Sequence, residues 1–345
     1  MEDATTLKYL VRAYCATYNQ EEYIADTLNG FVSQQTTFPV VYTIVDDAST
    51  DRNPQVILDF LQKNFNLHEQ GVAYDTTKDY GRIIFARHNT NTNCYFAVIL
   101  LNENHYQKGK SKSPYLTEWM NTKYTTYCEG DDFWVDPFKI QKQVDFLESH
   151  PDYNLVCSNW NILKDGAIHE SPVHNLYKVP FSFTFATLPW VWITKTLTMM
   201  YRNDSFDLEI LKKFKYSRDV HIVYFALKNS KGYYSPEITG TYRVVDKGVW
   251  SKVNQNKKNE ATYCLYKELY SFEPNKAVRK RYMNATLAYF NGLAFGKHTW
   301  HHIGTNARLY FEALRNVSDA KDLVFCLGGL VPTAFVKWIM RTFKI

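Results

Sequence analysis

The chain has 345 residues, of which 45% are hydrophobic and 22% are charged, and its formal net charge is +5. This composition excludes a disordered chain, and the small positive charge excludes a nucleic-acid-binding surface, so we expect no nucleic-acid partner. The length suits one large α/β domain with an appendage.

The six cysteines are scattered along the chain and show no metal-ligand spacing. Scattered thiols in a chain of this size favour a reducing compartment. The first residues lack the basic and apolar regions of a signal peptide. We therefore expect a cytoplasmic protein.

The first part of the chain alternates apolar runs of strand length with stretches of helical periodicity. The expected strands are residues 9–16, 40–45, 83–86 and 124–128, and the expected helices are residues 20–33 and a stretch that includes Val56, Ile57, Phe60 and Leu61. This alternation predicts a mostly parallel sheet covered by helices on both faces.

The pattern changes near residue 252, where it becomes helical and basic without further strands. We therefore expect an α/β domain over residues 1–251 and a helical region over residues 252–345. Residues 323–343 are the most apolar stretch and carry Trp338 and Phe343 among basic residues. This stretch fits either an anchor in a membrane interface or a helix packed on the domain, and the sequence leaves both open.

Acidic residues follow two of the expected strands directly. Asp46 and Asp47 end the second strand, and residues 129–132, which contain Glu129, Asp131 and Asp132, follow the fourth. Ligands bind beyond the carboxyl ends of the strands in such sheets. Adjacent carboxylates favour a bound cation, and oxygen ligands favour Mg²⁺ or Mn²⁺ with a nucleotide diphosphate completing the coordination. An Asp-rich turn that caps the next helix is equally compatible with the spacing.

Three ordered motifs resolve this ambiguity through a resemblance. The chain contains Thr17, Tyr18 and Asn19 after the first strand, residues 46–51 after the second, and the run 129–144 after the fourth. Together these motifs resemble the inverting family 2 glycosyltransferases of GT-A fold, especially bacterial enzymes that assemble surface polysaccharides. The resemblance covers residues 7–160 and, less closely, 190–251.

The resemblance implies a GT-A fold, with a Rossmann-like, mostly parallel sheet flanked by helices and a helical C-terminal appendage. It implies that Asp131 and Asp132 hold the metal ion and that Asp219 is the catalytic base, which removes the acceptor proton. The residues that it assigns to the nucleotide are Thr17, Asn19, Asp46, Asp47, Arg87, Glu129 and Arg243.

The expected reaction moves a hexosyl or N-acetylhexosaminyl group from a nucleoside diphosphate sugar, with UDP favoured, to a saccharide hydroxyl. The acceptor expected from the resemblance is polyprenyl-diphosphate-linked, which would place the protein at the inner face of the membrane. Two alternatives remain. A nucleotidyltransferase that makes nucleotide sugars would need a Gly-rich loop after the first strand, where residues 16–21 contain no glycine. A non-catalytic carbohydrate-binding subunit would not need the aspartates.

Residues 102–112 form a polar and basic stretch between the third and fourth expected strands. The composition is typical of a solvated surface loop. A lid over the active site is the second interpretation of the same stretch.

Overall fold

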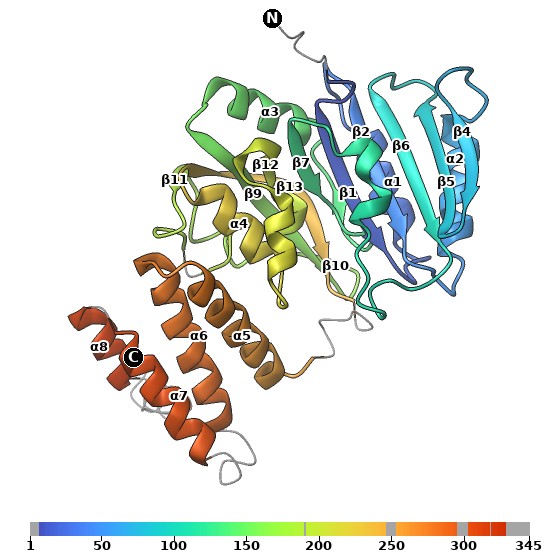
Figure 1. Ribbon diagram of the computed structural model, residues 1–345. Coiled ribbons are helices and arrows are strands. Elements are labelled where there is room, and N and C mark those ends of the chain that lie inside the picture. Colours follow the sequence, from blue (N-terminus) through green and yellow to red (C-terminus); the bar gives the residue numbers. More distant parts are fainter. Residues whose placement is uncertain (1–6, 190, 246–252, 295–302, 318, 329–345) are drawn as a thin grey trace, which may run out of the picture. The chain divides into compact units, whose positions relative to one another are not determined.

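The computed structural model describes residues 7–189, 191–245, 253–294, 303–317 and 319–328 (Figure 1). The chain divides into two compact units. The first comprises residues 1–207 and 223–245, and the second comprises residues 208–222 and 246–345. The predicted boundary after residue 251 lies outside the described residues and stays a prediction.

Four parallel strands form the centre of the sheet in the first unit, in the order β7, β1, β2, β6 (Figure 1). Their bounds are Val11–Thr17 for β1, Val40–Asp46 for β2, Cys94–Leu101 for β6 and Tyr124–Tyr127 for β7. The parallel centre confirms the prediction drawn from the alternating pattern.

Further strands extend the sheet on both sides of this centre, and they pair antiparallel except for one parallel pair, which the two longest of them form. Beyond β6 lie β5 (Gly81–His88), β3 (Phe65–Asn66) and β4 (Tyr74–Lys78). Beyond β7 lie β12 (Met200–Arg202), β9 (Tyr153–Lys164), β13 (Lys231–Arg243) and β11 (Phe181–Phe183), with β10 (Ala167–Glu170) on β9 and β8 (Phe133–Trp134) on β13.

Three helices cover one face of the sheet: α1 (Ile24–Val32), α2 (Asn53–Asn64) and α3 (Lys139–Ser149). In α1 the apolar residues Ile24, Leu28 and Phe31 recur at helical spacing and are all fully buried. The opposite face carries a second apolar cluster that includes Trp119 and is covered by the short 3₁₀ turns η1 (Ser113–Tyr115) and η2 (Thr117–Trp119).

Three short 3₁₀ turns and one helix lie between residues 196 and 227. They are η3 (Thr196–Thr198), η4 (Asn203–Ser205), η5 (Leu208–Lys213) and α4 (Asp219–Leu227). Strand β6 was absent from the sequence prediction, although its run of eight mostly apolar residues is typical of a strand buried on both faces.

The second unit is helical, as the sequence predicts, and contains α5 (Gln255–Phe272), α6 (Lys276–Ala294), α7 (Ile303–Arg315) and α8 (Ala320–Gly328). Glu312 of α7 accepts hydrogen bonds from Tyr263 and Lys267 of α5, at 3.0 and 2.8 Å, and from Tyr282 of α6. One carboxylate therefore ties three helices together. Cys326 of α8 packs into the apolar cluster of this unit.

The predicted membrane-associating stretch, residues 323–343, begins within α8 and continues from residue 329 outside the described residues. Among the residues that the structure describes, no helix combines the length and the apolar character that a membrane crossing requires.

Candidate active site

Three loops meet at the carboxyl ends of the parallel strands β1, β2 and β7. Thr17 at the end of β1 lies opposite Asp46 at the end of β2. The loop that follows β7 turns back onto β1, where the amide of Gly130 donates to the carbonyl of Ala16 at 3.1 Å. The structure thus brings the two acidic motifs to one edge of the sheet, where ligands bind in folds of this type.

Gly130 makes this close approach because it has no side chain. A Cβ at this position would lie 2.7 Å from Thr17 Oγ1 and 2.5 Å from Gln20 Oε1. The hydroxyl of Thr27 in α1 donates to the carbonyls of Gly130 and Asp132, at 3.0 and 2.6 Å. Residues 129–132 are therefore held by β1 through the Gly130 amide and by α1 through Thr27.

Asn19 and Asp46, both predicted to contact the nucleotide, connect the loops of β1 and β2. Asn19 has a φ of 52°, and its Oδ1 accepts the Thr50 amide at 2.7 Å. The Asp46 carboxylate accepts hydrogen bonds from the hydroxyl of Ser49 at 2.5 Å and from the side-chain Nδ2 of Asn53 at 2.6 Å. Both side chains therefore shape the loops, and their contact with a nucleotide stays a prediction.

Asp47 is buried beneath residues 102–112. Its Oδ1 accepts the His105 amide at 2.8 Å, and its Oδ2 accepts the Tyr106 amide at 3.0 Å and the ammonium of Lys112 at 2.9 Å. Burial raises the pKa of Asp47, but the hydrogen bonds from Lys112, His105 and Tyr106 outweigh it, so the net pKa is lowered. The stretch interpreted as a solvated loop or a lid is thus fixed to the carboxylate predicted to receive the base.

The acidic run, residues 129–132, brings together three carboxylates, of which Asp132 is buried and Glu129 and Asp131 are half-buried. Burial raises the pKa of Glu129, Asp131 and Asp132. The charge of Asp131 raises the pKa of Glu129 and of Asp132 further. Lys195 opposes this for all three, and Arg243 does so for Asp131. Three carboxyl groups with raised pKa values are costly to ionise together. A cation bound among them lowers this cost, so their arrangement favours cation binding.

Arg243, at the end of β13, contacts the acidic run, and its contact with a nucleotide stays a prediction. Its amide donates to Asp132 Oδ1 at 2.8 Å, and its Nε donates to the carbonyl of Asp131 at 3.0 Å. Its guanidinium pairs with Asp26 at 2.5 Å and lies 4.8 Å from the ring centroid of Tyr23. Backbone and side chain together hold Arg243 beside the run.

Lys195 and Thr196 also reach the acidic run, although the sequence assigned no role to either. The Thr196 hydroxyl donates to Glu129 Oε2 at 3.2 Å, and Lys195 Nζ lies 3.5 Å from the ring centroid of Tyr242. The two residues lie 66 and 67 positions after Glu129, in a stretch of no regular periodicity. In the sequence, only their place within residues 190–251, which resemble the family less closely, pointed toward them.

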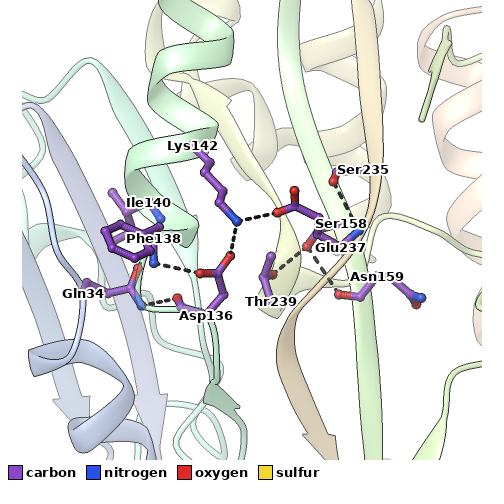
Figure 2. Close-up of polar contacts among 10 residues, drawn as sticks. All are labelled: Gln34, Asp136, Phe138, Ile140, Lys142, Ser158, Asn159, Ser235, Glu237 and Thr239. Carbon is purple, nitrogen blue, oxygen red and sulfur yellow. Dashed lines mark hydrogen bonds and ion pairs between the residues drawn. The ribbon is translucent and has the colours of Figure 1, made fainter. Parts of the chain in front are cut away.

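Residues 136–142, which follow the acidic run, make contacts that hold the start of α3 in place (Figure 2). Asp136 Oδ1 accepts the Phe138 amide at 2.9 Å, and Oδ2 pairs with Lys142 at 3.1 Å, one turn into α3. Lys142 also pairs with Glu237 of β13 at 2.7 Å, and Gln34 donates to the carbonyl of Asp136 at 2.8 Å. Asp136 thus braces the turn that leads into α3, although no side chain caps this helix at its N-cap residue, Phe138.

Arg87, predicted to contact the nucleotide, is not brought to this edge. It lies opposite Tyr95 of β6, which lies opposite Val41 near the start of β2, and its guanidinium pairs with Glu69. Val41 precedes Asp46 by five residues, which in a strand is roughly 16 Å. The physical reason is direction: β5 is antiparallel to β6, so its carboxyl end lies at the opposite edge.

Asp219, the predicted base, is the first residue of α4 and belongs to the second unit. Its Oδ1 accepts the amide of Val220 at 2.9 Å. The preceding loop is tied to α5, because the carboxylate of Glu268 accepts the amides of Lys215 and Tyr216 at 2.8 and 3.0 Å. Its catalytic role stays a prediction.

Asp131 and Asp132 suit a cation that brings further ligands with it. Within the described ranges, no three His, Cys, Asp or Glu side chains converge so that they could hold a metal ion by themselves. Mg²⁺ and Mn²⁺ bound through one or two carboxylates are commonly completed by phosphate oxygens and water. The residues present therefore fit a metal ion that binds together with a diphosphate.

Comparison with known proteins gives a family and a set of structural neighbours. The family model described as Glycosyl transferase family 2 matches residues 14–211. Uncharacterized proteins of Mycobacterium bovis and Mycobacterium tuberculosis are 35% identical over 140 residues, which are 41% of this chain and 32% of theirs. The chain thus matches about a third of the length of these curated relatives.

Two solved structures resemble the chain over most of its length. S. aureus TarS in complex with UDP-GlcNAc has a TM-score of 0.58 and 16% identity, over 90% of this chain and 82% of that one. The mannosyltransferase PcManGT from Pyrobaculum calidifontis, in complex with GDP-Man and Mn²⁺, has a TM-score of 0.52 and 14% identity, over 96% and 84%. Likeness at these identities establishes a shared fold.

Proposed function

The chain belongs to glycosyl transferase family 2, and from this premise we propose that it transfers a sugar from a nucleoside diphosphate sugar to a saccharide hydroxyl, with inversion. The predicted GT-A fold is confirmed, and glycosyl transfer, rather than nucleotidyl transfer, is the activity of the family. The observation that carries the proposal is the run Glu129, Asp131 and Asp132 at the carboxyl ends of β1 and β7, closed by Arg243.

The acidic run supplies the donor side of the reaction. In the proposal Asp131 and Asp132 would hold Mg²⁺ or Mn²⁺, which would supply positive charge for the departing diphosphate. Arg243 lies beside the same carboxylates and adds positive charge to this end of the site. The Mn²⁺ and GDP-Man bound by the Pyrobaculum mannosyltransferase support this pairing of ion and diphosphate.

Asp219 supplies the acceptor side. Its carboxylate takes the proton of the acceptor hydroxyl while the acceptor oxygen forms a bond to the anomeric carbon. The bond from that carbon to the phosphate oxygen breaks in the same step, and the diphosphate leaves with the electron pair. A single displacement of this kind inverts the configuration at the anomeric carbon.

The nucleotide in the proposal is UDP, because the Asp47 carboxylate suits the imide N–H of uracil and because TarS binds UDP-GlcNAc. The transferred group is then a hexosyl or N-acetylhexosaminyl group. GDP is the first comparison in any donor screen, since the Pyrobaculum neighbour binds GDP-Man.

The proposed acceptor is a lipid-linked saccharide of surface-polysaccharide synthesis, reached from the inner face of the membrane. The apolar and basic residues of the stretch 323–343 support this placement. Deletion of residues 329–345 keeps α8 and should move the protein from the membrane fraction to the soluble fraction. A full-length protein found wholly in the soluble fraction contradicts this part of the proposal.

The substitution Asp219→Asn tests the reaction directly. We expect kcat for sugar transfer to fall by about 10²- to 10⁴-fold, while nucleotide binding and the melting temperature stay unchanged. Asp204→Asn, at an exposed aspartate of η4, is the matched control and should keep the activity. Transfer by Asp219→Asn at the rate of the control would exclude Asp219 as the base.

A further inference from the structure

Lys195 lies just before a backbone segment, residues 197–199, that is held by hydrogen bonds from buried side chains. The carbonyl groups of residues 197–199 each accept a hydrogen bond from a buried side chain. The donors are Trp134, Gln143 and Thr126, at 2.8, 2.7 and 2.8 Å respectively. A segment bonded in this way presents the residues before it at a defined place.

Lys195 and Thr196 are thereby held next to the acidic run, residues 129–132. Thr196 donates to Glu129 at 3.2 Å, and the Lys195 ammonium rests over the ring of Tyr242, 3.5 Å from the centroid. The residue after Tyr242 is Arg243, whose amide binds Asp132 at 2.8 Å. The aromatic ring therefore holds the ammonium beside the carboxylates by a cation–π contact.

The formal charges at this place suggest an exchange of cations. Three carboxylates, Glu129, Asp131 and Asp132, face two cations, Lys195 and Arg243, which leaves a charge of −1 when all five groups are ionised. A divalent ion would change the sum to +1, and the negative charge of a diphosphate would then offset it. Ion and diphosphate are thus accommodated together more easily than the ion alone.

We propose that Lys195 is the exchangeable counter-ion of the acidic run, which balances the carboxylates before the donor binds and gives way to the metal ion that arrives with the nucleoside diphosphate. The inference rests on the proposed function and adds a role for a residue of the same site. Its consequence is that metal and diphosphate bind cooperatively, and that Lys195 sets the strength of this coupling.

Binding of Mn²⁺, followed by the electron paramagnetic resonance signal of the free ion, tests the proposal without measuring activity. The full-length protein and the variants Lys195→Met, Lys195→Arg and Lys231→Met are each titrated alone, with UDP and with GDP. Lys231 is the matched control, because its ammonium also lies over a tyrosine ring, that of Tyr153, and pairs with an aspartate. Methionine keeps the length of the side chain and its contact with Tyr242.

We expect Lys195→Met to bind Mn²⁺ alone at least about tenfold more tightly than the unsubstituted protein, since a nearby like charge is removed. UDP or GDP should then tighten Mn²⁺ binding less in this variant than in the others. Lys195→Arg and Lys231→Met should behave as the unsubstituted protein does. A structural role for Lys195 would instead weaken Mn²⁺ binding or lower the melting temperature of Lys195→Met.

Two outcomes overturn the inference. One is Mn²⁺ binding by Lys195→Met that is no tighter than that of the unsubstituted protein, including no binding by either. The other is tightening by UDP and GDP that is equal in both. Failure of every protein to bind UDP or GDP would count against the proposed function, whereas the Mn²⁺ titration without nucleotide still decides the role of Lys195.

Discussion

Lys112 Nζ lies 2.9 Å from Asp47 Oδ2, so the segment of residues 102–112 is fixed to the carboxylate at the end of β2. The amides of His105 and Tyr106 bind the same carboxylate. A nucleobase that binds Asp47 must therefore share these oxygens with the segment or displace it. This arrangement favours the lid interpretation of the segment over the solvated loop.

The substitution Asp47→Asn should release this segment. An amide group replaces one acceptor oxygen with a donor that faces the ammonium or a backbone N–H, and hydrogen bonds to charged groups contribute about 1.5–3 kcal/mol each. We expect trypsin to cleave after Lys108 or Lys110 at least about tenfold faster than in the unsubstituted protein, as followed by mass spectrometry. Asp75→Asn, which breaks an exposed pair with Arg82, should not change this rate. Equal cleavage of both variants would show that Asp47 does not hold the segment.

The substitution Gly130→Ala should destabilise the first unit. The new Cβ would lie within 2.7 Å of Thr17 and Gln20, so the acidic loop or the end of β1 must shift. Overpacking of this kind costs about 1–3 kcal/mol, which urea denaturation can measure. Gly304→Ala is the control, since a Cβ there meets nothing within 4 Å. A stability of Gly130→Ala equal to that of the control would mean that the loop accommodates the methyl group freely.

The substitution Asp131→Asn should have opposite effects on stability and on metal binding. The pKa of Asp131 is raised, first by burial, so the folded chain loses stability as the pH rises from the ordinary value near 3.8 through the raised pKa. Without metal at pH 8 we expect the amide to raise the melting temperature by a few degrees, at about 1 kcal/mol. Mn²⁺ and UDP together should raise the melting temperature of the unsubstituted protein but not that of Asp131→Asn. A variant still stabilised by Mn²⁺ and UDP would remove Asp131 from the proposed metal ligands.

Sequence reasoning placed the two acidic motifs at one edge of the sheet, because polar motifs follow the ends of parallel strands. Arg243 lies beside Asp131 and Asp132 although more than 100 residues separate it from them, and only the resemblance assigned it to the same site. Lys195 was not predicted because its position depends on an irregular segment fixed by distant side chains. Arg87 was placed incorrectly because spacing along the chain does not reveal that β5 runs antiparallel to β6.

The contacts of the irregular segment 102–112 could not be predicted from the sequence either. The polar stretch 102–112 has no periodicity, so nothing in its sequence showed that two amides and Lys112 bind Asp47. The β6 run is continuous rather than alternating, and such a run has the same hydrophobic pattern whether it forms a buried strand or part of a buried helix.

His221 should make the stability of the protein depend on pH below neutrality. It is fully buried in the first turn of α4, its ring lies 4.4 Å from that of Phe214, and its Nδ1 accepts the amide of Arg218 at 3.2 Å. Burial lowers its pKa to about 4, from an ordinary value near 6.5. The unfolded chain therefore binds a proton at this residue at a higher pH than the folded chain does.

The sign of the effect follows from this difference in proton binding. Stability should fall as the pH decreases from about 6.5 to about 4, by up to about 3 kcal/mol from this residue. We expect His221→Gln to lose less stability than the unsubstituted protein between pH 7 and pH 5 in urea denaturation. His68→Gln, at an exposed histidine, should lose as much as the unsubstituted protein. Parallel losses in all three proteins would mean that His221 takes up its proton equally well in the folded chain.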